Sequence, residues 1–191
     1  MKKIIALILA LTAVFALVSC DDADHSALEP YKAAIDATSP NRATINVSVT
    51  NNALGVTLDG SYVAEYGEDG ATVTYEYEKL NEIGADDMIS VVKGTATVSA
   101  DGTVSGDVDA KVSAATAVKI NLDPSKITYS IERGILTVTV KAADTQAVLG
   151  VDLGADASMT MTVSDSGKIG SVSYSYSIGT DNTVSVVCFY E

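Results

Sequence analysis

The chain has 191 residues, a length that fits one domain or two very small ones. It carries 25 Asp and Glu against 12 Lys and Arg, and this net charge of −13 argues against a nucleic-acid-binding protein, which needs a cationic face. The hydrophobic fraction of 47% is too high for a disordered chain, and two Cys with one His exclude a Cys₄ or Cys₂His₂ zinc site.

Residues 1–19 predict a signal peptide. A short cationic start is followed by the apolar run from Ile4 to Val18, which at about 1.5 Å per residue is too short to span a ~30 Å hydrocarbon core. The tetrapeptide Leu17-Val18-Ser19-Cys20 resembles the lipobox of bacterial lipoproteins. The resemblance implies that diacylglycerol is attached to Cys20, that the signal is cut just before it, and that the protein is anchored to the extracytoplasmic face of a bacterial membrane. An ordinary secreted protein, cleaved after a small residue, is the alternative.

Residues 20–26 predict an acidic tether between the lipid anchor and the folded domain. Asp21 and Asp22 follow the lipobox directly. In enteric Gram-negative lipoproteins, acidic residues at this place resemble a signal for retention in the inner membrane. In Gram-positive bacteria they would only be a spacer, and both alternatives stay open. His25 has no set of partner ligands in this stretch, so we interpret it as part of a solvated spacer and not as a metal ligand.

One short helix is expected before the first strand, over residues 27–37. Ser26 and Glu29 have the spacing of a capping box, with Ser26 as the N-cap. An apolar stripe follows at helical spacing, formed by Leu28, Tyr31 and Ile35. The segment Thr38-Ser39-Pro40 ends the helix.

After Pro40 the hydrophobic period changes to two, which predicts about ten or eleven antiparallel strands in a single domain over residues 27–191. From Val104 to Leu122, apolar residues recur at even-numbered positions. This stretch is too long for one ordinary strand, so we expect it to form two. Further on, the sequence predicts one helical turn that is capped by Asp144 and stopped by Gly150.

The turn signals predict the register of neighbouring strands. Residues directly opposite in an antiparallel pair point to the same face, so each turn length must bring apolar side chains opposite one another. Six turns meet this condition, among them a two-residue turn at Asn51-Asn52 and a three-residue loop over residues 180–182. The pairs that they predict are, in chain order, Val49–Leu54, Tyr62–Tyr75, Val98–Val104, Ile131–Leu136, Met161–Val172 and Tyr176–Val186.

A lipid-anchored N-terminus, one amphipathic helix and about eleven antiparallel strands together resemble a family of half-barrel carriers. The family is typified by the periplasmic lipoprotein chaperone and by the mycobacterial lipoprotein lipid carriers. The resemblance covers Ser26 to Glu191 and rests on the order of the elements, without a matching residue motif. It implies a strongly curved sheet that holds acyl chains on its concave face.

The mature domain lacks the residue sets of common enzymes, and we expect no enzyme, no cofactor and no metal site. Because His25 is the one His, no Ser/His/Asp triad can form in the domain, and no glycine-rich phosphate loop follows a strand into a helix. Cys188 lies in an apolar run without an adjacent base, so we interpret it as core. We interpret the acidic pairs as solvated surface; they are Glu76 with Glu78, Asp86 with Asp87, Asp107 with Asp109 and Asp152 with Asp156.

Tyrosine is the compositional signal that favours a ligand site. Of the nine Tyr, six fall on predicted apolar strand faces: Tyr62, Tyr66, Tyr75, Tyr77, Tyr174 and Tyr176. A Tyr ring offers an apolar body with a polar tip, although strands also select Tyr for the sheet itself. We therefore expect a lipoprotein that binds or carries an apolar, lipid-like ligand. The alternative is an envelope-structural or adhesion module without a small ligand, whose protein partner the sequence does not identify.

Overall fold

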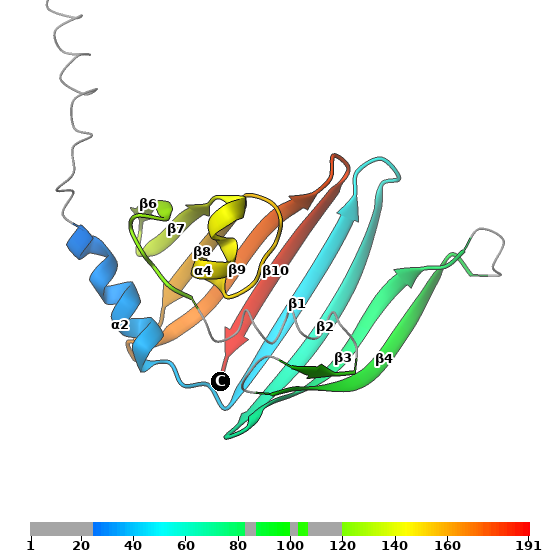
Figure 1. The fold of residues 1–191 in the computed structure, drawn as a ribbon, viewed down its shortest axis with the longest axis horizontal. Coiled ribbons are helices and arrows are strands. Elements are labelled where there is room, and N and C mark those ends of the chain that lie inside the picture. The colour runs from blue at the N-terminus through cyan, green and yellow to red at the C-terminus, as the bar shows by residue number, and fades with distance from the viewer. Residues whose placement is uncertain (1–24, 83–86, 100–102, 107–119) are drawn as a thin grey trace, which may run out of the picture.

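The computed structural model describes residues 25–82, 87–99, 103–106 and 120–191, so the predicted signal peptide, the anchor residue Cys20 and most of the tether lie outside it. The ten strands of the described chain form one antiparallel sheet that is not closed into a barrel, accompanied by two short α-helices (Figure 1). The prediction of a mainly β domain with about ten or eleven antiparallel strands is confirmed.

Two meanders meet at the centre of the sheet. The N-terminal meander consists of β1 (Arg42–Asn51), β2 (Val56–Gly67), β3 (Gly70–Leu80), β4 (Ile89–Ser99) and β5 (Val104–Ser105). The C-terminal meander consists of β6 (Ile127–Glu132), β7 (Ile135–Val140), β8 (Ala157–Val163), β9 (Ile169–Ile178) and β10 (Asn182–Tyr190). The strand order is β5-β4-β3-β2-β1-β10-β9-β8-β7-β6, so β1 pairs with β10 and joins the two halves.

Alternation of side chains gives the sheet an inner and an outer face. The inner face carries the hydrophobic core, including Ile45, Val138 and Cys188, and the outer face carries the residues between them, which are mainly Ser and Thr. The short helix α4 (Thr145–Leu149) adds Val148 and Leu149 to the core over the C-terminal meander (Figure 1). Among the described residues, no helix lies over β2–β4.

The predicted N-terminal helix is confirmed as α2 (Glu29–Ala37), which contacts β8 and β9, but its start differs from the prediction. The 3₁₀ helix η1 (His25–Leu28) precedes it, and the N-cap residue is Leu28, whose side chain makes no capping hydrogen bond. The prediction that Ser26 is the N-cap was therefore wrong, because Ser26 lies inside a 3₁₀ turn that precedes the α-helix. His25, which we expected in a solvated tether, lies in η1, and its Nδ1 is 3.1 Å from the Tyr129 hydroxyl on β6.

Four of the six predicted registers are confirmed. The pairs observed as predicted are Tyr62–Tyr75, Val98–Val104, Ile131–Leu136 and Met161–Val172. In the turn between β6 and β7, Arg133 and Gly134 both have positive φ, as a two-residue hairpin turn requires.

Two predicted registers were wrong, each by an even number of residues. Val49 lies opposite Leu58 and not Leu54, because the turn has four residues: Asn51 Oδ1 accepts a hydrogen bond of 2.8 Å from the Leu54 N–H, and Gly55 takes a positive φ. Tyr176 lies opposite Val184 and not Val186, because the loop begins at Gly179, which also has a positive φ. An even shift keeps apolar residues opposite one another, so parity cannot detect it.

Most of the stretch from Val104 to Leu122, for which two strands were predicted, lies outside the described residues, since residues 107–119 are not described. Its described part contains the two-residue strand β5. Ile120 and Leu122 are buried but do not belong to a strand. Their alternating spacing therefore reflects contact with the hydrophobic core and not pairing in the sheet. The predicted helical turn is confirmed as α4 with Gly150 at its end, but the Asp144 side chain makes no capping hydrogen bond.

Candidate ligand-binding site

All six candidate tyrosines lie on the inner face, but the structure separates them into two groups. Tyr62 and Tyr66 on β2 and Tyr75 and Tyr77 on β3 belong to the N-terminal meander, whereas Tyr174 and Tyr176 share β9. Tyr62 and Tyr174 are almost fully buried, with 4% and 2% of their surface exposed, and the other four are partly buried. Strands β1 and β10 lie between the two groups.

Three tyrosines of the N-terminal meander form a continuous cluster, which we call the tyrosine patch: Tyr62, Tyr75 and Tyr77. The ring centroids of Tyr62 and Tyr75 are 6.3 Å apart, and those of Tyr75 and Tyr77 are 5.8 Å apart. Tyr62 and Tyr75 are directly opposite in the register, and Tyr77 follows two residues along β3. Centroid distances in this range are those of interacting aromatic pairs.

Two strand glycines make room for the rings of the tyrosine patch. A Cβ at Gly94, which lies opposite Tyr75 on β4, would overlap the Tyr75 hydroxyl. A Cβ at Gly60 would lie 3.1 Å from Cε2 of Tyr62 and 3.0 Å from Cβ of Tyr77. Aromatic rings of this kind cover backbone that has no side chain of its own. The sequence predicted Gly60 opposite Tyr77, and the structure confirms this pair. The space that a strand glycine leaves for a neighbouring ring is a signal that the prediction did not use at either position.

The centre of the inner face of the C-terminal meander is fully buried. Its central side chains are fully buried, including Leu136, Met159, Met161 and Val172, and α4 packs with them in one core cluster. Tyr174 and Tyr176 lie in this layer with ring centroids 6.2 Å apart and nearly parallel planes. By contrast, Val47, Val49, Tyr75 and Tyr77 in the N-terminal meander are only partly buried. Apolar surface therefore stays accessible on the inner face of both meanders, at Tyr176 and Ile178 in the C-terminal one and over β1–β3 in the N-terminal one, where it includes the tyrosine patch.

Three ionisable groups are buried together at one end of the inner face. The hydroxyls of Tyr66 and Tyr190 have no hydrogen-bond partner, and burial raises the pKa of both, with the nearby Cys188 adding to the effect. Burial raises the pKa of the Cys188 thiol to about 12, so it is protonated at neutral pH. The interpretation of Cys188 as core is confirmed, since its side chain is fully buried.

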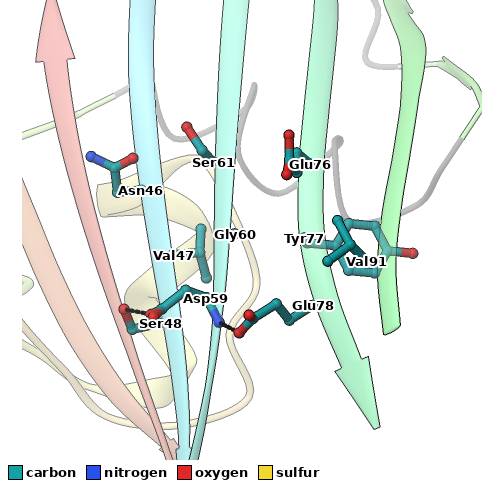
Figure 2. A pocket seen from close by; sticks show the side chains of 10 residues that line it. All are labelled: Asn46, Val47, Ser48, Asp59, Gly60, Ser61, Glu76, Tyr77, Glu78 and Val91. Carbon is teal, nitrogen blue, oxygen red and sulfur yellow. Dashed lines mark hydrogen bonds between the residues drawn. The ribbon is translucent and has the colours of Figure 1, made fainter. Parts of the chain in front are cut away.

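A pocket lies at a fork in the sheet, and residues of both faces line it. Pairing of β2 with β3 ends at Gly60 and Tyr77, and beyond this point Asp59 pairs only with β1 and Glu78 only with β4. The resulting pocket has a volume of about 400 Å³ (Figure 2), and its lining residues are Asn46, Val47, Ser48, Asp59, Gly60, Ser61, Glu76, Tyr77, Glu78 and Val91.

Hydrogen bonds within the chain already engage the carboxylates of this fork pocket. The Ser48 hydroxyl donates to Asp59 Oδ1 at 2.6 Å, and the Asp59 N–H donates to Glu78 Oε2 at 3.0 Å (Figure 2). Lys93 Nζ lies 2.9 Å from Glu76 Oε2. Glu76 and Glu78 thus lie on the solvated face, as predicted. Sequence reasoning missed the pocket because its position depends on where the β2–β3 pairing ends.

The other acidic pairs belong to the surface or lie outside the described chain. Asp156 accepts hydrogen bonds from Lys141 Nζ at 2.7 Å and from the Ala142 N–H at 2.9 Å, and these bonds lower the pKa of its carboxyl. Asp152 Oδ1 accepts from the Gly154 N–H at 3.0 Å. Within the described ranges, no group of three or more His, Cys, Asp or Glu side chains is placed to hold a metal ion. Asp86, Asp107 and Asp109 are among the residues that the structure does not describe.

Comparison with known proteins found no family model that matches this chain and no curated protein that is significantly similar to it. In the described part of the chain, no helix combines the length and the apolar character that crossing a membrane requires.

Proposed function

We propose that this protein is a non-enzymatic lipoprotein, anchored through Cys20 to the extracytoplasmic face of a bacterial membrane, that binds or carries an apolar, lipid-like ligand. The ligand lies on the inner face of the N-terminal meander, against the tyrosine patch. The observation that carries the proposal is the difference between the two halves of this face: most of the fully buried core lies in the C-terminal half, while Tyr75, Tyr77, Val47 and Val49 stay partly accessible on β1 and β3.

The chemistry of the patch fits a ligand with a long apolar body. Aromatic and aliphatic side chains line most small-molecule sites, and burial of apolar surface stabilises a complex by about 25 cal/mol per Å². The ring faces of Tyr75 and Tyr77 supply such surface over β3, and the rings lie along the sheet because Gly60 and Gly94 leave them space. In this proposal the sheet curves as in the half-barrel carriers, with the tyrosine patch on its concave face.

Mass spectrometry of the lipids that co-purify with the full chain tests the ligand directly. The chain is extracted in mild detergent, washed, and compared with a Tyr75→Ala/Tyr77→Ala double variant. We expect a defined lipid class to accompany the wild type near one molecule per chain and to be strongly depleted from the variant. Equal lipid content in both proteins would contradict a site on the tyrosine patch.

The anchor is tested separately from the ligand. Cys20→Ser removes the sulfur that would carry diacylglycerol, so we expect no incorporation of a fatty-acid analogue and an unprocessed precursor. Cys188→Ser is the matched control, because Cys188 is the other cysteine and is buried in the core. Equal labelling of wild type and Cys20→Ser would rule out the lipid anchor.

The second candidate function is an envelope-structural or adhesion module without a small ligand. It is favoured by the outer face of the C-terminal meander, where uncharged hydroxyl side chains cover five strands. A wild type that retains no lipid and binds no apolar probe would leave this function in place of the carrier.

A further inference from the structure

The outer face of the C-terminal meander is a surface made mostly of hydroxyl side chains. In the register of the sheet, one row runs across all five strands and on to β1: Thr128, Thr139, Ser158, Ser175, Ser185 and Ser48. Neighbouring hydroxyls bond to one another, with Thr160 Oγ1 2.6 Å from Ser173 Oγ and Thr162 Oγ1 2.9 Å from Ser171 Oγ. We call this surface the hydroxyl face.

The hydroxyl face is almost free of charge on a chain whose net charge is −13. Among the described residues of β6–β10, Glu132, at the end of the edge strand β6, is the one charged side chain on this face. The outer face of the N-terminal meander differs, because its charged side chains are Arg42, Asp59, Glu65, Glu76, Glu78 and Lys93.

Two large apolar side chains are exposed within the hydroxyl face. Phe189 on β10 has 45% of its surface exposed, and Ile135 on β7 has 43% exposed. Phe189, Ser171, Thr162 and Ile135 follow one another in a single row across the strands. An exposed aromatic residue among uncharged polar neighbours is typical of the centre of a protein interface, where charged residues are depleted.

We propose that the hydroxyl face is where a second copy of this chain docks, sheet against sheet. A hydroxyl both donates and accepts hydrogen bonds, so a hydroxyl surface is complementary to itself, as a two-fold symmetric interface requires. Two copies of an acidic chain repel one another over most of their surface. The hydroxyl face carries almost no charge, so two copies can approach there with little repulsion. Phe189 and Ile135 are the apolar anchors of the contact.

The size of the face agrees with a reversible dimer. Five strands about 4.8 Å apart and three to four rows about 6.8 Å apart cover roughly 500–650 Å² on each copy. Burial of both copies gives about 1,000–1,300 Å², which is near the lower limit for a specific interface. We therefore expect association in the micromolar range, strengthened where membrane anchoring holds two copies on one surface.

Sedimentation of the full chain in density-matched detergent, from low to high micromolar concentration, tests this proposal. We expect the protein mass per particle to double with concentration, and added salt to promote dimerisation because it screens the repulsion between acidic chains. Phe189→Asp places two like charges at the interface of each dimer and is expected to weaken dimerisation roughly a hundredfold or more. Ser185→Glu is a second variant at an exposed position that leaves the core untouched.

The matched control is Val91→Asp, which adds the same charge to an exposed outer-face position of the N-terminal meander, where 52% of the Val91 surface is exposed. Dimerisation that survives Val91→Asp and is lost in both Phe189→Asp and Ser185→Glu supports the hydroxyl face as the interface. A wild type that stays monomeric over the whole range, or a dimer that is equally sensitive to Val91→Asp, overturns the proposal.

Discussion

The two meanders of this sheet are built from the same alternating pattern and yet differ on both faces. The C-terminal meander holds most of the fully buried core side chains, with α4 packed against them, and its outer face carries hydroxyls almost without charge. The N-terminal meander keeps its inner face partly accessible at the tyrosine patch, and its outer face is charged. The comparison indicates that one half serves as the stable scaffold while the other half has surface available for a ligand.

We expect the largest difference in the free energy of unfolding when one inner-face leucine of each meander is truncated to alanine. Leu136→Ala removes a fully buried side chain from the C-terminal meander and should lower the free energy of unfolding by about 3 kcal/mol. Leu58→Ala removes a partly buried inner-face leucine from the N-terminal meander and should cost about 1 kcal/mol. Urea denaturation measures both values, and similar losses would break the distinction between the two halves.

The pH dependence of stability reports on the burial of Cys188 in the C-terminal meander. Burial raises its pKa from 9.0 to about 12, so the folded state holds its proton more tightly than the unfolded state. This contribution to stability is fully present below about pH 9 and is lost as the pH rises towards 12. We expect the urea midpoint to fall above pH 9, and Cys188→Ser to remove part of that fall.

Reactivity of Cys188 gives an independent check of the same burial. A maleimide should label this thiol in the native protein only as fast as the sheet opens, and at once in urea, because the side chain is fully buried. Fast labelling of the native protein would mean that the C-terminal meander is open.

A glycine substitution is expected to have an intermediate effect confined to the N-terminal meander. Gly94→Ala adds a Cβ that would overlap the Tyr75 hydroxyl, so the ring must rotate off the sheet. We expect weaker binding of an apolar probe with a loss of stability of about 1 kcal/mol. Gly134→Ala is a control in the C-terminal meander, where a Cβ would meet no atom within 4 Å, although the positive φ of Gly134 adds strain that affects stability alone.

We expect the smallest change in the free energy of unfolding when a buried tyrosine hydroxyl without a hydrogen-bond partner is removed. Tyr190→Phe removes an unsatisfied donor, so the free energy of unfolding should stay the same or rise by less than about 1 kcal/mol. Tyr129→Phe is the contrasting variant, because its hydroxyl contacts His25 Nδ1, and its loss should be mildly destabilising. A clear loss of stability in Tyr190→Phe would show that its hydroxyl has a partner in solution.

The sequence predicted the faces of the sheet better than its register or its order. Parity placed all six candidate tyrosines on the inner face, because a pleated strand alternates strictly. It could not fix the turns after Asn51 and Ile178, since a shift by two or four residues preserves parity. The pairing of β1 with β10 depends on contacts between distant residues such as Val47 and Val186, for which no local signal exists.

Titration with a fluorescent fatty acid tests the central claim, that the N-terminal meander holds the ligand site, most directly. We expect the wild type to bind the probe, Tyr77→Ala to weaken binding by about 1–2 kcal/mol, roughly five- to thirtyfold, and Tyr77→Phe to keep most of it. Tyr176→Ala, the matched change at a partly buried tyrosine of the C-terminal meander, should leave the affinity nearly unchanged while both alanine variants stay folded. No binding by the wild type, or equal losses in Tyr77→Ala and Tyr176→Ala, would contradict the account.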